Sequence, residues 1–298
     1  MQTSFIALDW GTSSFRAYRV GDDGSVLETV SAPNGILTVE KGTFDDALET
    51  HIGSWDVVTP ILASGMITSR QGWVELPYVA CPANLKSISG ALHTHTSKRG
   101  RKIHFVPGVS TRDASGTPDV MRGEETQVMG ASVGGLEYFI TPGTHCKWIN
   151  VENSEIKSFA TYMTGEVYAV LKNHSILGRL MTGDSYYEAA YERGVRAGLK
   201  DPGGVLHRIF STRTLVLFNE MPTDQLSSYL SGQVIGTEIA HAIADHSTDA
   251  QYSILASPAL AQHYVSAMKF AKLKVRFSDP DVAVKGLLKI AQTAGIIQ

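Results

Sequence analysis

Asp9-Trp10-Gly11-Thr12-Ser13-Ser14 is the stretch of this 298-residue sequence that decides its fold. The apolar run at residues 5–8 before it is typical of a buried strand, and residues 15–20 after it alternate apolar and polar side chains. Residues 21–25 then predict a second turn before a third strand at 26–30. We therefore expect the chain to open as a three-strand meander whose first connection is a Gly-Thr turn.

A Gly-Thr turn between two strands suits phosphate, because glycine lets the backbone come close and hydroxyl groups can donate to phosphate oxygens. Gly11 and the hydroxyls of Thr12, Ser13 and Ser14 would form such a cradle. Asp9, at the end of the strand, would lie beside the phosphates and bind Mg²⁺ directly or through water. Taken alone, the turn could equally be a plain hairpin connection.

The same pattern recurs about half a chain later. Residues 135–140 predict an apolar strand, residues 141–147 a turn, and residues 148–151 and 156–160 two further strands. Gly143 and Thr144, with Thr141 and His145 beside them, would form a second phosphate cradle. Two matching hairpins indicate an internal duplication and favour phosphate binding over a plain turn.

The remaining pattern predicts a mixed sheet with helices on its faces. We expect a helix over 44–52 and a strand over 60–66, then helices over 186–197, 223–231, 234–246, 258–272 and 281–294, with strands over 251–256 and 274–277. A hinge near residue 130 would divide the chain. Residues 1–130 would carry the first hairpin and the acceptor loops, and residues 131–298 the second hairpin and the adenosine site. We expect the last helix to be able to pack back on the first part.

Composition excludes several functional classes. Hydrophobic residues make up 43% of the chain and charged residues 18%, and the net charge is −3, which favours neither nucleic acid nor an anionic membrane surface as a partner. No apolar run approaches the roughly 20 residues of a membrane helix, and the N-terminus lacks the pattern of a signal peptide. Cys81 and Cys146 are the only cysteines, so we expect a cytoplasmic protein without a disulfide framework.

The hairpin motifs carry a resemblance to a known superfamily. Asp9-Trp10-Gly11-Thr12-Ser13, with Arg16 and the second Gly-Thr hairpin, resembles the phosphate-1 and phosphate-2 motifs of the actin and hexokinase superfamily of ATPases. More narrowly, the chain resembles the 2-dehydro-3-deoxygalactonokinase family over essentially its whole length. The segments that carry this likeness are Ala63–Ser69, Gly72-Trp73, Leu76–Tyr78, Cys81–Ala83, Met121–Gln127, Thr141–Trp148, Thr164–Glu166 and His174–Leu177.

The resemblance implies an α/β protein with the actin-like ATPase fold, in which two ribonuclease-H-like lobes, each a mixed sheet flanked by helices, enclose an ATP cleft. It implies a kinase that uses ATP and Mg²⁺ to phosphorylate the C6 hydroxyl of 2-dehydro-3-deoxy-D-galactonate, giving 2-dehydro-3-deoxy-6-phosphogalactonate and ADP, in galactonate catabolism. Another small sugar, sugar-acid or amino-sugar kinase of the superfamily is the alternative, and a homodimer is left open.

Two functions other than catalysis fit the sequence less well. A non-catalytic sugar or nucleotide sensor often carries an added DNA-binding module, whereas this sequence reaches the first phosphate strand at residue 5. An actin-like filament protein would need an assembly surface, which no part of the sequence suggests.

The second hairpin departs from the superfamily in one respect, because Thr141 stands where many members carry an aspartate. We therefore expect Asp9 to be the only metal carboxylate of the two hairpins and the catalytic base to lie elsewhere. Phosphoryl transfer to an alcohol needs a carboxylate within hydrogen-bond reach of the hydroxyl.

The segment around Gly123 is the best candidate for that base. Glu124 and Glu125 would lie in the first turn of a helix, where the helix dipole stabilises carboxylates. The segment resembles the Gly-Asp-helix motif of glycerol-type kinases, which puts Glu124 at the place of their catalytic aspartate. Glu125 and Asp119 are reserves, and acidic capping of an ordinary helix is the plain alternative.

A sugar acid carries a carboxylate, so its pocket should hold an arginine or a cluster of backbone amides. Arg122 is our first choice, ahead of Arg16, Arg70 and Arg112. Other candidates for substrate binding are Ser64, Gly65, Met66 and Ile67 in a loop, Trp73 as a stacking ring, and Thr164 and Glu166 from the second half. Trp73 could equally be a core anchor, and Thr164 a helix cap.

For the adenosine end, the strand-turn-helix around Ser257 and the stretch around Gly236 are candidate walls, although either could be a plain helix start. His93, His95 and His104 flank a basic stretch. We expect a solvated loop there rather than a metal site, because no third ligand has suitable spacing.

Overall fold

The computed structural model describes residues 3–244, 250–277 and 281–298. Contacts group the chain into two compact units. The described residues of unit 1 fall within 1–136, 149–159 and 279–298, and those of unit 2 within 137–148 and 160–278. The C-terminal helix α10 (Val282–Thr293) therefore belongs to unit 1. The expected hinge near residue 130 stays a prediction.

Unit 1 is built on a six-stranded sheet of order β3-β2-β1-β4-β7-β6. Its strands are β1 (Thr3–Trp10), β2 (Phe15–Gly21), β3 (Val26–Ala32), β4 (Ile61–Ser64), β6 (His93–Thr96) and β7 (Lys102–Phe105). The first three form the expected antiparallel meander, and β4 runs parallel to both β1 and β7. A small sheet of order β5-β8-β9 consists of β5 (Val79–Ala80), β8 (Val109–Arg112) and β9 (Pro118–Met121).

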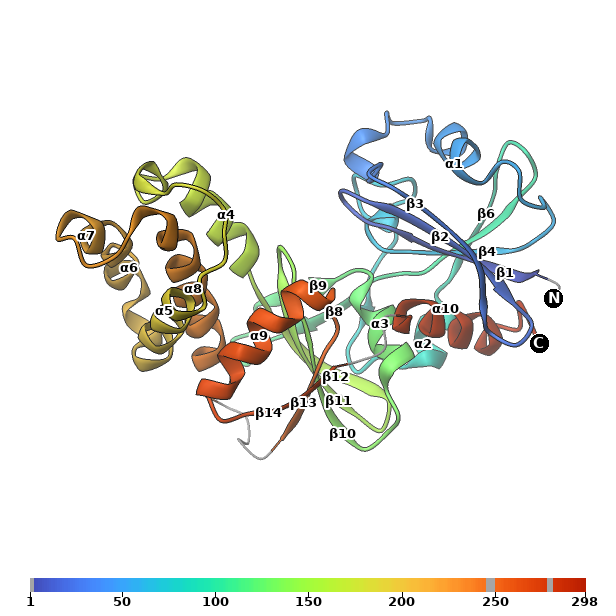
Figure 1. Cartoon of the computed structure of the whole chain (residues 1–298). Coiled ribbons are helices and arrows are strands. Elements are labelled where there is room, and N and C mark those ends of the chain that lie inside the picture. Colours follow the sequence, from blue (N-terminus) through green and yellow to red (C-terminus); the bar gives the residue numbers. More distant parts are fainter. Residues whose placement is uncertain (1–2, 245–249, 278–280) are drawn as a thin grey trace. The chain divides into compact units, whose positions relative to one another are not determined.

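Helices cover both faces of the six-stranded sheet (Figure 1). On one face, α1 (Phe44–Ile52) buries Leu48 and Ile52 against Ile6 and Leu8 of β1. On the other lie α2 (Leu85–Gly90), α3 (Glu124–Ala131) and α10. Alternate β1 residues face opposite sides, so Asp9 lies on the side of α3 and α10.

The second sheet has the order β12-β11-β10-β13-β14. Its strands are β10 (Leu136–Thr141), β11 (Cys146–Glu152), β12 (Glu155–Tyr162), β13 (Gln251–Ile254) and β14 (Lys274–Phe277), with β13 parallel to β10 and β14. In unit 2, α9 (Pro258–Phe270) packs Tyr264 and Ala267 against Tyr252 and Ile254 of β13. Mixed sheets flanked by helices were expected, and this α/β class is confirmed.

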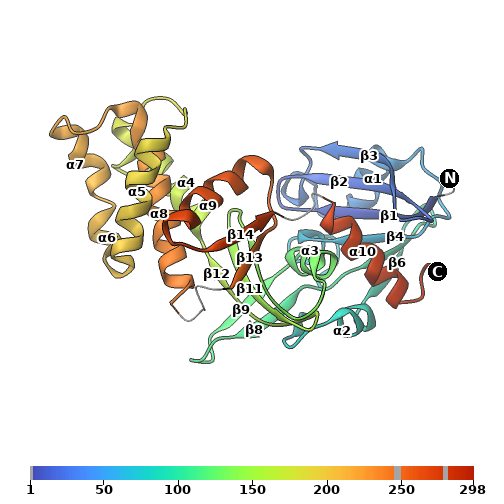
Figure 2. The same ribbon diagram turned by 60° about the horizontal axis from the view of Figure 1, so that its bottom comes forward.

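Unit 2 also carries a group of helices: α4 (Thr164–His174), α5 (Glu188–Lys200), α6 (Val205–Arg208), α7 (Ser211–Leu217) and α8 (Leu226–Ala242). Figure 2 shows α5 lying alongside α8. A Cβ atom on Gly194 would lie 2.1 Å from the Tyr229 carbonyl oxygen, and one on Gly232 2.1 Å from that of Tyr191. The two helices therefore touch backbone to backbone.

This contact corrects one expectation. We expected separate helices over 223–231 and 234–246, but α8 is continuous through Gly232. Gly232 does not end the helix. It lies where the α5 backbone packs against α8, because only a residue without a side chain fits there. The final residues expected for the second helix, 245 and 246, lie outside the described residues.

The expected solvated loop covers only residues 97–101, where Lys98 and Arg99 are exposed, and it does not include the histidines. His93 and His95 lie on β6 and His104 on β7, joined by a turn that ends at Arg101. Arg101 is buried, and its Nε donates to Glu49 (2.8 Å), which gives the turn an anchor inside unit 1. Within the described ranges, no group of three or more His, Cys, Asp or Glu side chains is placed to hold a metal ion.

None of the helices in the described residues is both long enough and apolar enough to cross a membrane.

Candidate active site

Hairpin 1, the turn between β1 and β2, forms the predicted tight connection. The Gly11 N–H donates to the Ser14 carbonyl oxygen (2.9 Å), and Thr12 and Ser13 are exposed. The turn therefore presents its hydroxyls to solvent, as a phosphate cradle requires.

A segment that the sequence did not single out holds hairpin 1 in place. The Ile36 N–H donates to the Gly11 carbonyl oxygen (3.0 Å), and the Trp10 indole N–H donates to the Asn34 carbonyl oxygen (2.9 Å). A Cβ atom on Gly35 would lie 2.1 Å from the Thr12 carbonyl oxygen, so only glycine fits there. Backbone atoms of residues 34–37 thus support the turn from one side.

Asp9 is the penultimate residue of β1, beside hairpin 1, and is half-buried. In the sheet it is paired with Arg16 on β2 and with Ser64 on β4. Burial raises the pKa of the Asp9 carboxyl, and the positive charge of Arg16 opposes that rise. Gly65 follows Ser64 and has φ +92°. A Cβ atom on Gly65 would lie 3.2 Å from an Asp9 carboxylate oxygen. The loop of residues 64–67, here called the acceptor loop, therefore passes directly beside Asp9.

The start of α3 reaches the same place. Gly123 has φ +103°, and a Cβ on it would lie 3.4 Å from the Cα of Gly65. Glu124 is the first residue of α3, as expected, and its carboxylate accepts the Arg122 backbone N–H (3.0 Å). Unit 1 therefore brings together Asp9, the Gly65 loop and the Gly123–Glu124 turn from three separate segments.

Glu125 differs from Glu124 in where its carboxyl group lies. It is 1% exposed and accepts the Gly123 N–H (2.7 Å) and the Thr126 hydroxyl (3.0 Å). Burial, and to a lesser extent the charge of Glu124, raises the pKa of Glu125 to about 8. Glu125 is thus an internal, proton-holding group, whereas Glu124 is half-buried. Asp119 lies on β9.

Arg122 donates from its side chain to the Thr68 hydroxyl (2.8 Å) and the Leu76 carbonyl oxygen (2.5 Å). Its guanidinium carbon lies 4.1 Å from the ring centroid of Tyr78. The Nε of Arg122 is buried without a hydrogen-bond partner in the described structure. Arg122 therefore supports the acceptor loop and keeps one donor unused.

The other acceptor-loop candidates are mostly turned inward. Ser64 and Ile67 are buried, and Met66 packs against the core of unit 1. The Trp73 ring stacks on Phe44 at 5.9 Å between centroids and meets the Phe105 ring edge-on, which makes it a core anchor. The alternative interpretation of Trp73 is the one the geometry favours.

Hairpin 2, between β10 and β11, lies in unit 2. Thr144 and His145 are exposed, while Thr141 is buried and its hydroxyl has no hydrogen-bond partner among the described residues. The start of α4 packs on this turn, since a Cβ on Gly165 would lie 2.4 Å from the Gly143 carbonyl oxygen. The Glu166 N–H donates to the Thr144 carbonyl oxygen (3.0 Å), and the Glu166 side chain pairs with His145.

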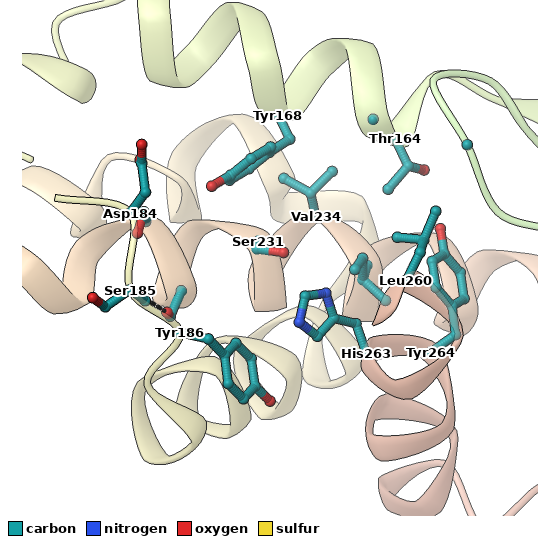
Figure 3. Close-up of a pocket in the computed structure, with 15 residues that line it drawn as sticks. Thr164, Tyr168, Asp184, Ser185, Tyr186, Ser231, Val234, Leu260, His263 and Tyr264 are labelled. Carbon is teal, nitrogen blue, oxygen red and sulfur yellow. Dashed lines mark hydrogen bonds between the residues drawn. The ribbon is translucent and has the colours of Figure 1, made fainter. Parts of the chain in front are cut away.

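A cavity of about 220 Å³ opens next to hairpin 2 within unit 2. Tyr168 and Val234 lie on one side and Tyr186 and His263 on the opposite side (Figure 3). Its other lining residues are Gly143, Thr164, Gly165, Asp184, Ser185, Ser227, Ser228, Ser231, Ile235, Leu260 and Tyr264.

The two expected adenosine contacts lie elsewhere in unit 2. Gly236 faces α5, where a Cβ would lie 2.5 Å from the Val195 carbonyl oxygen, and Ser257 precedes α9 as its N-cap residue. Neither is among the described residues that line the cavity. Their neighbours Val234, Ile235 and Leu260 do line it, and the role of Gly236 and Ser257 stays a prediction.

Comparison with known proteins identifies relatives of this chain. The family model described as 2-keto-3-deoxy-galactonokinase matches residues 9–290. The 2-dehydro-3-deoxygalactonokinase of Escherichia coli (strain K12) is 33% identical over 242 residues, 80% of each chain. A crystal structure from Sinorhizobium meliloti, provisionally assigned as a 2-dehydro-3-deoxygalactonokinase, is 35% identical with a TM-score of 0.89 and covers 97% of this chain and 96% of its own.

A more distant structure supports the fold alone. The activator of 2-hydroxyisocaproyl-CoA dehydratase from Clostridium difficile, with bound ADPNP, is 10% identical, with a TM-score of 0.51 over 98% of this chain and 96% of its own. The expected actin-like ATPase fold is confirmed. By sequence and by structure, the chain belongs to the 2-keto-3-deoxy-galactonokinase family of ATP-dependent sugar kinases.

Proposed function

We propose that this protein transfers the γ-phosphoryl group of ATP to the C6 hydroxyl of 2-dehydro-3-deoxy-D-galactonate, as a cytoplasmic step of galactonate catabolism. Family membership supports the substrate. The observation that carries the chemistry is the gathering of Asp9, Gly65 and Glu124 next to a hydroxyl-rich phosphate turn.

Residues of both hairpins are candidates for nucleotide binding. In unit 1, Gly11, Thr12, Ser13 and Ser14 would bind phosphate oxygens. In unit 2, Gly143, Thr144 and His145 would do the same, and the adjoining cavity would take the nucleoside. Apolar and aromatic side chains on two sides of that cavity suit a planar base, and its serines and Asp184 can meet polar base or ribose atoms.

Asp9 would hold Mg²⁺. Magnesium takes oxygen ligands, keeps several waters, and often needs only one or two protein carboxylates beside the substrate phosphates. A half-buried carboxylate beside a phosphate turn fits that requirement. When bound, the ion neutralises negative charge on the phosphates. A cation also favours the ionised form of Asp9, which burial alone disfavours.

Glu124 would act as the base. It accepts the proton of the sugar hydroxyl as the oxygen forms its bond to the γ-phosphorus, while the bond from phosphorus to the bridging oxygen breaks and ADP leaves. Glu125 suits this role less well, because it is buried and burial raises its pKa to about 8. The short distance between backbones at Gly123 and Gly65 supports a hydroxyl held between Glu124 and Asp9.

The loop at Ser64, Gly65, Met66 and Ile67 would bind the sugar, and Arg122 its carboxylate, while Trp73 would support this loop from the core. The buried, unpartnered Nε of Arg122 supports this assignment, since such a donor costs free energy unless an acceptor meets it. Thr164 and Glu166, expected at the acceptor, lie beside hairpin 2 and are better placed to support the phosphates.

A coupled assay of ADP formation tests the function directly. Purified protein with ATP and Mg²⁺ is offered 2-dehydro-3-deoxy-D-galactonate, its gluco epimer, other sugar acids and neutral hexoses, and phosphorus–proton coupling in NMR locates the new phosphate. We expect kcat/KM at least about a hundredfold higher for the keto acid than for any neutral hexose, with phosphate on C6. Equal activity on a neutral hexose would overturn the assignment.

A further inference from the structure

A buried carboxylate in unit 2 lies behind both hairpin 2 and the cavity. Glu238, on α8, is 3% exposed. One of its oxygens accepts the indole N–H of Trp148 (2.7 Å). The other accepts the hydroxyls of Tyr264 (2.8 Å) and Thr164, and the Cys146 thiol also hydrogen-bonds to this carboxylate.

These four donors come from the elements that build the proposed nucleotide site. Cys146 and Trp148 lie on β11, directly after hairpin 2. Thr164 begins α4, and Tyr264 lies on α9. Thr164 and Tyr264 also line the cavity and lie at the same end of it (Figure 3).

The link from Glu238 to hairpin 2 runs along two routes. One is β11, where Cys146 is the first residue after the turn. The other is α4: fixing Thr164 sets the place of Gly165, which contacts the Gly143 carbonyl oxygen, and of Glu166, which bonds to Thr144 and His145. A shift of α4 would therefore move the turn as well as the cavity wall.

The chemistry of the contacts requires a carboxylate at this point. An ionised carboxylate accepts hydrogen bonds on both oxygens and donates none, so it satisfies four donors at once. A glutamine of the same shape would turn an N–H₂ group towards donors on one side. Burial raises the pKa of Glu238, and its hydrogen-bond donors oppose that rise.

We propose that Glu238 is a positioning residue for the nucleotide, holding hairpin 2, the start of α4 and the Tyr264 wall of the cavity in one fixed arrangement. The inference rests on the proposed function, because it assumes that hairpin 2 and the cavity bind ATP. Glu238 does not touch the phosphates itself. It acts through Thr164, Cys146 and Tyr264.

Calorimetric measurement of ligand binding distinguishes a positioning role of Glu238 from a general effect on protein stability. For Glu238→Gln we expect the Kd of ADP to rise at least about tenfold, while the Kd of 2-dehydro-3-deoxy-D-galactonate, measured without nucleotide, stays within about twofold. If Glu238→Gln does not fold, a pair at Thr164 carries the test. Thr164→Val, which loses the hydroxyl, should raise the Kd of ADP about fivefold. Thr164→Ser, which keeps the hydroxyl, should bind ADP like the wild type.

Gln233 provides the matched control. It is a buried polar residue on the same helix, bonded to Thr212 (3.1 Å) and Tyr229 (3.2 Å), and none of these partners belongs to hairpin 2 or α4. Gln233→Met should lower Tm and leave ADP binding within about twofold.

Two results would overturn the proposal. One is unchanged ADP binding in Glu238→Gln and Thr164→Val, and the other is a loss of ADP affinity in Gln233→Met as large as that in Glu238→Gln. Failure of the wild-type protein to bind ADP would instead overturn the proposed function.

Discussion

Hairpin 1 and hairpin 2 share a plan, in which a Gly-Thr turn joins two strands, but a carboxylate stands in a different place in each. At hairpin 1, Asp9 is the penultimate residue of the strand and lies half-buried beside the turn. At hairpin 2, the strand ends in Thr141. Glu166 pairs with His145 of the turn itself, and Glu238 is buried behind the turn among hydrogen-bond donors. Under the proposed function, charge would serve the ligand at hairpin 1, through Asp9, and the scaffold at hairpin 2, through Glu238.

The two turns also differ in how they are supported. Backbone atoms of residues 34–37 hold hairpin 1. Hairpin 2 rests on the start of α4 and on side chains that converge on Glu238. A turn held by side chains can be altered by single substitutions that leave its own sequence intact, so the comparison can be tested one residue at a time.

The largest expected effect is at Asp9. Asp9→Asn keeps the shape but removes the charge that would hold Mg²⁺, so kcat should fall about a thousandfold. Thr141→Val, at the matching position of hairpin 2, should keep kcat within about fivefold. Steady-state kinetics at saturating ATP and Mg²⁺ measure both. Similar losses in the two variants would remove the distinction between the hairpins.

Glu124 gives the next largest effect. Glu124→Gln cannot accept the hydroxyl proton and should lower kcat about a hundredfold with little change in KM. Glu125→Gln is the matched control, because the amide resembles the protonated carboxyl that the buried site favours. Single-turnover rates with both substrates saturating distinguish the two. The base assignment is wrong if Glu124→Gln keeps near-normal kcat.

The backbone contacts that support the two turns can each be disrupted by substituting one glycine with alanine. Gly165→Ala places a Cβ 2.4 Å from the Gly143 carbonyl oxygen, and Gly35→Ala places one 2.1 Å from that of Thr12. Each should raise KM for ATP about tenfold, since the turn must move to admit the new atom. Gly90→Ala meets nothing within 4 Å and serves as the control. An unchanged KM in both variants would show that the turns adjust freely.

The smallest effect concerns pH. Because the pKa of Glu125 is raised from 4.5 to about 8, folding keeps a proton that the unfolded chain releases. The free energy of unfolding should therefore fall as pH rises through this window and level off above it, by at most a few kcal/mol (about 1.4 per pKa unit). Urea unfolding at pH 5 and pH 8 should show a smaller fall for Glu125→Gln than for the wild type. A fall of the same size in both would contradict the assigned proton.

Much of the fold could be predicted from sequence because it is local. The strand alternation and turn residues of hairpin 1 lie within a few positions, and an acidic pair after Gly123 marks the start of α3. Glycines were harder to interpret. Gly232 looks like a helix breaker, but the spacing of Gly194 with Gly198 and of Gly232 with Gly236 was the available signal for two closely packed helices.

The support of the site could not be predicted, because it joins residues far apart in the chain. Glu238 meets Cys146, Trp148 and Thr164, which precede it by 74 positions or more, and Tyr264, 26 positions later. No periodic pattern links such positions. For the same reason, no sequence pattern places His263 of α9 in the cavity.

Manganese binding tests the division of labour between the hairpins most directly, because it needs no catalysis. Mn²⁺ is titrated into the wild-type protein, Asp9→Asn and Thr141→Val in the presence of ADP, and bound ion is followed by electron paramagnetic resonance. We predict that the affinity for Mn²⁺ falls at least about fivefold in Asp9→Asn and is unchanged in Thr141→Val. Equal affinity in all three proteins, or a loss confined to Thr141→Val, would contradict Asp9 as the metal carboxylate.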